Sequence, residues 1–211
     1  MSLRQVFLEA AALVRPLLDH PTLTDRWDEP SALELMTVGE VAAHLTRAVT
    51  TVQRYLDEPI PHTPLLDAPG YLTSVDGLAD DITTSLHRQI RERAAIEARG
   101  GPTLVRTAWD ETLERLTTRL AGEPPDRRIG VFGGRAMLLD QYLVTRILEL
   151  VVHGDDLATT LALPPPAFGP PITGVVIDCL LEVARRRHGD LAVVRAFTRR
   201  ERDTSEALRV L

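Results

Sequence analysis

One run of residues, 138–163, constrains the fold more than any other part of this sequence. It reads LLDQYLVTRILELVVHGDDLATTLAL and contains no glycine or proline before Gly154. It is long enough for about seven helical turns. Apolar residues cover most of its circumference, as is typical of a helix at the centre of a bundle. The run therefore predicts a mainly α fold built around this helix.

A strip of polar side chains interrupts the apolar surface of the predicted central helix. Its members recur every three or four residues, so they lie on one helical face: Tyr142, Arg146, Glu149, His153 and Asp156. Burying ionisable groups costs free energy unless something pairs with them. A bound metal ion is one such partner, and a ladder of salt bridges along the strip is the alternative.

Other amphipathic patterns predict helices around the central one. Thr37 and Glu40 have the Thr-x-x-Glu form of a capping box, which marks the start of a helix. Four prolines between residues 59 and 70 indicate a loop. The predicted helices cover residues 3–19, 37–56, 76–98 and 102–120, and a short strand is expected at 129–132.

The proline-rich segment 164–171, PPPAFGPP, is predicted to be a stiff linker. It divides the chain into a helical bundle, 1–163, and a tail, 164–211. In the tail we expect a helix at 172–188 and a β-hairpin with strands at 191–197 and 207–211. An appendage of this size is too small to fold alone, so it should pack against the bundle.

The charge and composition of the chain indicate which functional classes and which cellular compartment it fits. A net charge of −6 argues against a nucleic-acid binder, whose surface should be basic. The sequence has no signal-peptide pattern and no apolar run long enough to span a bilayer. The single cysteine, Cys179, excludes an internal disulfide and fits a reducing compartment. We expect a soluble cytoplasmic protein, either a monomer or a homodimer.

The spacing Glu-x-x-x-His places two metal-binding side chains one helical turn apart. It occurs at Glu40/His44, Glu58/His62 and Glu149/His153. The first glutamate already has a capping role, and prolines interrupt the second pair. Only the pair at 149 and 153 lies inside a helix on an apolar background, although a helical ion pair or a core histidine also explains such a pair.

His44 is the candidate third ligand, from a neighbouring helix. Two histidines and one glutamate leave a fourth position open for water or substrate, as in catalytic zinc sites. The ligand set does not distinguish zinc from nickel or iron.

Two segments, MTVGEVAAHLTRA (36–48) and RILELVVHGDDLA (146–158), resemble the signature segments of the mycothiol-dependent maleylpyruvate isomerase family. The resemblance covers roughly residues 5–162 and implies a DinB-like, metal-binding four-helix bundle. The tail is similar to a shortened C-terminal domain of that family. The family's zinc ligands would be His44, Glu149 and His153.

The resemblance implies an enzyme in which zinc binds the sulfur of mycothiol, or of a related small thiol, and stabilises the thiolate. The thiolate would add to a small electrophilic substrate, which would then isomerise or remain conjugated. Arg146 is a candidate for binding a substrate carboxylate, although pairing with Glu149 or Asp156 is the favoured explanation, because ion pairs at this spacing are common on helices. Asp156 is either a hydrogen-bond acceptor behind a ligand imidazole or an ordinary helix-end carboxylate, and Tyr142 is a core residue at the strip.

A second function remains open from the sequence. A DinB-like bundle could retain the metal and act as a binding or stress-response protein without turnover.

Overall fold

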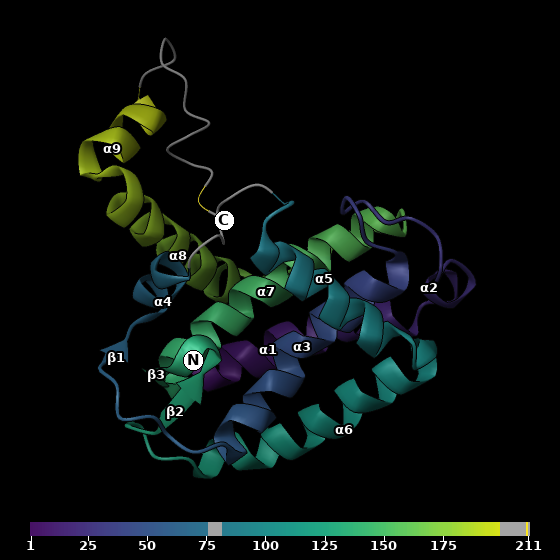
Figure 1. The fold of residues 1–211 in the computed structure, drawn as a ribbon, viewed down its shortest axis with the longest axis horizontal. Coiled ribbons are helices and arrows are strands. Elements are labelled where there is room, and N and C mark those ends of the chain that lie inside the picture. Colours follow the sequence, from purple (N-terminus) through teal and green to yellow (C-terminus); the bar gives the residue numbers. More distant parts are fainter. Residues whose placement is uncertain (76–81, 199–209, 211) are drawn as a thin grey trace.

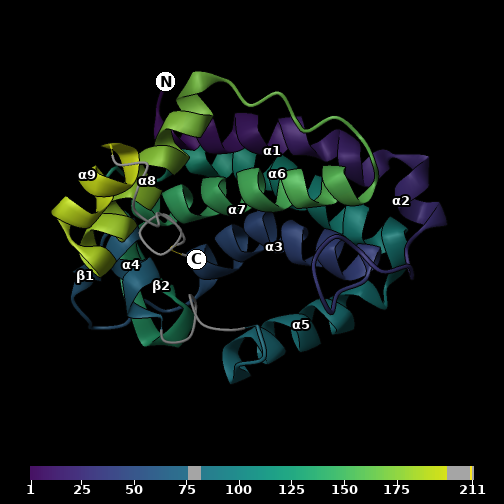
Figure 2. The same ribbon diagram turned by 90° about the horizontal axis from the view of Figure 1, so that it is seen from above.

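Four long helices form the body of the protein, in a computed structural model that describes residues 1–75, 82–198 and 210. They are α1 (Leu3–Asp19), α3 (Val38–Asp57), α6 (Gly101–Gly122) and α7 (Leu139–Thr160). Helix α7 packs between α1 and α3, and α6 closes the ring against both of them (Figures 1 and 2). The predicted mainly α four-helix bundle is confirmed.

Local capping explains where two of these helices begin. The Ser2 hydroxyl accepts the amide hydrogen of Gln5 at the start of α1. At the start of α3, the Thr37 hydroxyl accepts from the Glu40 amide at 3.2 Å, and the Glu40 carboxylate accepts from the Thr37 amide at 2.8 Å. These reciprocal bonds satisfy amide groups that have no partner within the helix. The capping box predicted at the start of α3 is confirmed.

The bundle is held together by burial of the apolar helix faces. The largest fully buried side chains come mostly from the four long helices and the strands: Phe7, Leu18, Leu23, Leu45, Trp109, Leu116, Leu120, Ile129, Met137, Leu139, Tyr142 and Leu143. Full burial of one such side chain contributes about 1.5–3 kcal/mol. Because α7 touches α1 and α3 together, its polar strip is enclosed on the side that faces α3.

Shorter elements connect the long helices. They are α2 (Pro21–Asp25), β1 (Leu65–Leu66), α4 (Ala68–Ser74), α5 (Ser85–Ala98), β2 (Arg128–Val131), a 3₁₀ turn (Phe132–Gly134) and β3 (Arg135–Leu138). The helix expected at 76–98 is observed from Ser85, and residues 76–81 lie outside the described part of the chain. The loop expected at 59–70 contains β1 and the start of α4.

A small sheet lies where α7 begins, with strand order β1–β3–β2. Strand β2 lies where the sequence predicted a strand, and it pairs antiparallel with β3, which was not predicted. Gly133 and Gly134 have φ angles of 76° and 70° in the turn between them. Glycine adopts this left-handed conformation without steric cost, which lets the chain reverse and return directly into α7.

The C-terminal region differs from the expected helix and hairpin. Helix α8 (Pro170–His188) is confirmed, but the strand expected at 191–197 is wrong, because helix α9 (Asp190–Thr198) occupies those residues. Gly189, with φ 85°, separates the two helices. A short apolar run is compatible with either state; here α9 packs on α8 and buries Val193. The second expected strand, 207–211, lies outside the described residues apart from Val210.

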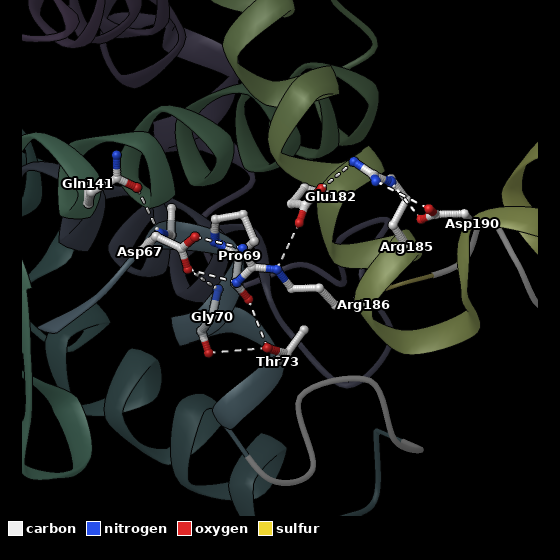
Figure 3. A network of polar contacts seen from close by, with 10 residues as sticks. Asp67, Pro69, Gly70, Thr73, Gln141, Glu182, Arg185, Arg186 and Asp190 are labelled. Carbon is white, nitrogen blue, oxygen red and sulfur yellow. Dashed lines mark hydrogen bonds and ion pairs between the residues drawn. The ribbon is translucent and has the colours of Figure 1, made fainter. Parts of the chain in front are cut away.

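Helix α8 is fixed against α4 by a network of charged side chains at the surface (Figure 3). Arg186 donates two hydrogen bonds to the Asp67 carboxylate, at 2.8 and 2.7 Å, and a third to Glu182 at 2.9 Å. Asp67 also accepts the Gly70 amide at 2.8 Å and thereby caps α4. On the other side, Gln141 of α7 accepts the Ala68 amide at 2.9 Å. Helix α4 is therefore anchored to both α7 and α8.

None of the described helices combines the length and the hydropathy that crossing a bilayer requires.

Candidate metal centre

Three metal-ligating side chains meet where α3 packs against α7. His44 lies on α3, and Glu149 and His153 lie one turn apart on α7. The His44 Nε2 and His153 Nε2 atoms are 3.2 Å apart. Glu149 Oε2 lies 3.6 Å from the first nitrogen and 3.2 Å from the second. The structure thus brings together the three residues that the sequence singled out, across more than a hundred positions of chain.

These distances can be compared with what a metal ion would require. Zinc bonds of 2.0–2.1 Å to nitrogen and oxygen in tetrahedral geometry separate the ligand atoms by about 3.3–3.4 Å. The three observed separations, 3.2, 3.2 and 3.6 Å, bracket this value. The donor set fits as well, because imidazole nitrogen and carboxylate oxygen are both ordinary zinc ligands. These residues could hold a divalent ion with little rearrangement.

The pKa values of His44, His153 and Glu149 are shifted in different directions, because burial and neighbouring charges act on each group differently. Burial lowers the pKa of His44, so its imidazole is neutral. For His153, burial also lowers the pKa, but hydrogen bonds to Asp156 and Glu149 outweigh it and raise the pKa to about 9. Burial raises the pKa of Glu149, yet hydrogen bonds from the two histidines and the charge of Arg146 hold it well below its usual value. A metal ion would replace the proton on His153.

Asp156 lies directly behind one of the imidazoles. Its Oδ2 atom is 2.9 Å from His153 Nδ1. A proton on Nδ1 that is donated to this carboxylate leaves Nε2 free to face Glu149 and His44, as in many zinc-binding histidines. His44 has no such support, since its Nδ1 is buried and finds no hydrogen-bond partner among the described residues.

Arg146 and Tyr142 occupy the other end of the polar strip. The Arg146 guanidinium lies 4.8 Å from the centre of the Tyr142 ring, and its Nη2 is 3.6 Å from Glu149 Oε1. The Tyr142 hydroxyl shares a 2.7 Å hydrogen bond with Thr51, and the side chain is buried. Tyr142 is thus a core residue with a satisfied hydroxyl, whereas Arg146 is only loosely paired.

A cavity of about 140 Å³ adjoins the cluster on the side of Glu149 and His44. Its lining combines charged, phenolic and apolar side chains: His44, Arg47, Thr51, Tyr55, Tyr71, Leu72, Val75, Leu86, Ile90, Arg93, Phe132, Tyr142, Arg146 and Glu149. His153 is not part of this lining. A fourth ligand on an ion held by the three side chains would come from the cavity.

Sequence reasoning missed several residues of this cavity. Arg47 could have been found, because it lies one turn after His44 on the same helix. Tyr71 could not, since α4 follows a proline-rich loop and carries no motif. Arg93 of α5 also lacked a signal, because α5 is charged over most of its surface.

The other two Glu-x-x-x-His pairs do not form sites. The carboxylate of Glu40 caps α3. Glu58 ends α3 as its C-cap, and His62 lies exposed in the following loop. Helical context therefore distinguishes the pair on α7, which lies in the cluster with His44, from the other two.

The chain was compared with known proteins. The model of one family, described as mycothiol maleylpyruvate isomerase N-terminal domain, matches residues 7–158, well over half of the 211 residues. Neither the curated proteins nor the solved structures gave a match. The matched region spans α1 to α7 and includes His44, Glu149 and His153. The chain therefore belongs to the mycothiol maleylpyruvate isomerase N-terminal domain family.

Proposed function

We propose that this protein is a metal-dependent enzyme that activates a small thiol for addition to an electrophilic substrate. The ligands are His44, Glu149 and His153, the ion is zinc, and the thiol is mycothiol or a close relative. The observation that carries the proposal is the triangle of donor atoms, 3.2–3.6 Å on each side, beside a cavity. Family membership supports mycothiol as the thiol.

The chemistry follows from the charges at the site. A zinc ion supplies a Lewis acid that lowers the pKa of a bound thiol, and the thiolate is the nucleophilic form. The chain's own residues prepare that position. Asp156 orients the His153 ring through Nδ1, and the Arg146 guanidinium lies 3.6 Å from the outer oxygen of the Glu149 carboxylate. Apolar side chains, among them Leu72 and Val75, line part of the cavity where the electrophile would lie.

The size of the cavity indicates how the two reactants divide the space. A volume of about 140 Å³ is close to that of a cavity that holds one benzene molecule. The enclosed space therefore suits the small electrophile and the sulfur end of the thiol, and the remainder of a larger thiol extends outward. The buried, unpaired Cys179 fits a reducing cytoplasm, where such thiols are used.

Metal analysis of the purified protein is the direct test. We expect one equivalent of zinc per chain, lost in a His44→Ala variant. His62→Ala is a matched control, because it removes a histidine with the same Glu-x-x-x-His spacing from an exposed loop. Retention of zinc by His44→Ala, or absence of tight zinc binding in the wild type, would refute the ligand assignment.

A thiol-dependence assay then separates the enzyme from the alternative of a binding or stress-response protein. The zinc-loaded protein is incubated with small electrophiles, with and without mycothiol. Accelerated consumption of the electrophile only when thiol and zinc are both present supports the enzyme. Tight zinc binding without any thiol-dependent turnover would favour the binding protein.

A further inference from the structure

One wall of the cavity is a helix that lies outside the bundle. Helix α5 supplies Leu86, Ile90 and Arg93 to the lining. It packs against α3 and less against α6, on the outer side of the four long helices (Figure 2). The rest of the lining comes mainly from α3 and α7, which belong to the bundle, and from α4, which α7 and α8 hold on two sides. A movement of α5 would therefore open the cavity and leave the packing of the bundle intact.

Few buried side chains hold α5 in place. Of its 14 residues only Ala94 and Ala98 are buried, and both are small. The shorter helix α4, by comparison, buries Ala68, Tyr71 and Leu72. Because the stabilisation from burial grows with the apolar area removed from water, α5 is attached more weakly than its length suggests.

The first half of α5 is the more weakly held part. Leu86 and Ile90 line the cavity, so part of their surface faces space rather than packed atoms. Thr84, the N-cap, makes no side-chain capping bond, and its Oγ1 is buried without a hydrogen-bond partner in the described part of the chain, as is His87 Nε2. A buried polar atom without a partner costs free energy that is recovered when water reaches it. Outward movement of this half would hydrate both atoms.

Two polar contacts fix the other end of α5. Glu97 Oε1 accepts a 2.6 Å hydrogen bond from Arg47 Nη1 of α3. The Ala98 carbonyl accepts a 3.3 Å hydrogen bond from Trp27 Nε1. Within the described residues, the side-chain hydrogen bonds of residues 85–93 reach no other helix, since Arg91 donates only to a carbonyl of the preceding segment. The helix is therefore attached at its end and weakly held at its beginning.

A pair of glycines joins α5 to α6 directly after the fixed end. Gly101 has φ 75°, which glycine adopts without steric cost, and nothing lies within 4 Å of the position that a Cβ would take there. The chain can therefore change direction at this point. With a helical rise of about 1.5 Å per residue, a rotation of about 15° about Gly101 would move Ser85 by about 6 Å and Glu97 by about 1.5 Å. The smaller movement is enough to break the hydrogen bond between Glu97 and Arg47.

We propose that residues 85–98 form a flap that swings about Gly100 and Gly101 to open the cavity, with the Glu97–Arg47 ion pair as its latch. The inference deepens the proposed function by naming how ligands reach that site, and it rests on the proposed function only for the identity of those ligands. With the flap closed, the cavity of about 140 Å³ encloses a single small molecule. With the flap open, the same space admits a larger ligand, and the four long helices keep their packing.

Hydrogen exchange followed by mass spectrometry tests whether the flap opens. The full chain is measured as purified and again after treatment with a chelator, so the result does not depend on bound metal. After correction for intrinsic rates, we expect the amides of residues 89–93, which follow the four amides without a helical acceptor, to exchange at least about tenfold faster than those of residues 105–119 in α6. Glu97→Gln should speed exchange across 89–98 by about twofold to fivefold, because the ion pair is partly exposed. The matched control is Asp110→Asn, which removes an ion pair between α6 and Arg15 of α1 and should leave exchange in α5 unchanged.

Fraying of α5 would also speed exchange, so a second measurement follows access to the cavity. Leu72→Cys in a Cys179→Ala background places a single thiol on the α4 wall of the cavity, and Val75→Cys on the same wall replaces it if the first variant does not fold. The thiol is labelled with a small reagent, methyl methanethiosulfonate, and with a bulky one, fluorescein-5-maleimide. Adding Glu97→Gln should raise the labelling rate by about twofold to fivefold with the bulky reagent and by less with the small one. Comparing each variant with its parent for the same reagent cancels the intrinsic reactivity.

The outcomes separate this inference from the proposed function. Exchange in residues 89–93 as slow as that in α6 overturns the flap, and so does an equal effect of Asp110→Asn on α5. Rapid exchange with a bulky-reagent rate that Glu97→Gln leaves unchanged means fraying without opening, which also overturns it. Metal content and thiol-dependent turnover test the proposed function separately. A rigid α5 leaves the enzyme proposal standing, and a flap that opens in a protein without thiol-dependent turnover stands without the enzyme.

Discussion

Several groups of charged side chains join neighbouring helices in the described part of the protein, and two of these clusters differ in how their charges are balanced. Between α4 and α8, Arg186 contacts the carboxylates of Asp67 and Glu182 with hydrogen bonds of normal length. Between α3 and α7, two imidazole nitrogens and a carboxylate oxygen face one another at 3.2–3.6 Å, and Asp156 adds a second carboxylate. In the surface cluster a guanidinium is hydrogen-bonded to both carboxylates. In the buried cluster Arg146 approaches Glu149 only to 3.6 Å, and the three ligand atoms of His44, Glu149 and His153 converge on one point.

This difference distinguishes a structural network from a candidate binding site. Partly exposed ion pairs such as Asp67–Arg186 contribute modestly to stability and need no further partner. Buried acceptors that converge on one point are costly unless a proton or a metal ion lies between them. Burial lowers the pKa of His153, but hydrogen bonds to Asp156 and Glu149 raise it above its ordinary value, so protonation of this ring is one way to balance the buried carboxylates. The following predictions test whether the two clusters behave as differently as this comparison implies.

The largest effect should come from removing the charge of the buried cluster. We expect Glu149→Gln to lower zinc affinity by more than about 100-fold, because loss of a ligand should exceed the roughly 10–100-fold effects of changes behind the ligands. Competition with a chromophoric chelator measures the affinity. Asp67→Asn, in the surface cluster, is the control and should bind zinc as the wild type does. Equal zinc affinity in wild type and Glu149→Gln would mean that the buried cluster is not the metal site.

Zinc should also stabilise the folded protein. An ion that binds only the folded state at 100 times its Kd adds about 2.7 kcal/mol to the free energy of unfolding. For a chain of this length, that corresponds to a rise in Tm of roughly 5–10 °C. Differential scanning calorimetry with zinc and then with excess chelator measures the shift. The same rise in His44→Ala would show that zinc stabilises the protein from some other place.

A smaller loss of zinc affinity is expected when Asp156, the hydrogen-bond acceptor of the ligand His153, is changed. Asp156→Asn keeps the shape of the side chain but weakens the acceptor that orients His153, so zinc affinity should fall by about 10–100-fold. Asp155→Asn is the matched control, because the adjacent carboxylate is exposed and outside the cluster. Chelator competition again gives the affinities. If both variants retain wild-type affinity, Asp156 is an ordinary helix-end carboxylate.

The smallest expected effect is a pH-dependent change in the free energy of unfolding when the surface cluster is altered. The hydrogen bonds from Arg186 hold the pKa of Asp67 below its usual value of 3.8, so the folded state binds this proton less readily than the unfolded state. The resulting stability is complete above pH 4, and it is lost as the pH falls through the lowered pKa of the folded state. Asp67→Asn should therefore destabilise the protein by at most about 1 kcal/mol at pH 7, with the difference shrinking in acid. Urea unfolding at several pH values measures this, and a difference that grows in acid would contradict the assignment.

Much of the bundle follows from the sequence because its signals are local. The Thr37–Glu40 capping box and the uninterrupted apolar run 138–163 each specify a helix through contacts only a few residues apart. The C-terminal region shows the limit of such signals. The run LAVVRAF predicted a strand, but it forms helix α9, which packs against α8 and buries Val193.

In the candidate site too, the sequence determines one part and tertiary packing determines the rest. Helical spacing alone places Glu149, His153 and Asp156 on one face of α7, and so the sequence determines that part. Only the packing of α3 against α7 brings His44 Nε2 to 3.2 Å from His153, because no local rule fixes the distance between residues 109 positions apart. The cavity depends still more on tertiary structure, since Tyr71, Arg93 and Arg146 come from three different helices. The helical repeat determines which side chains of one helix lie together on a face. The packing of the core determines which side chains of different helices meet.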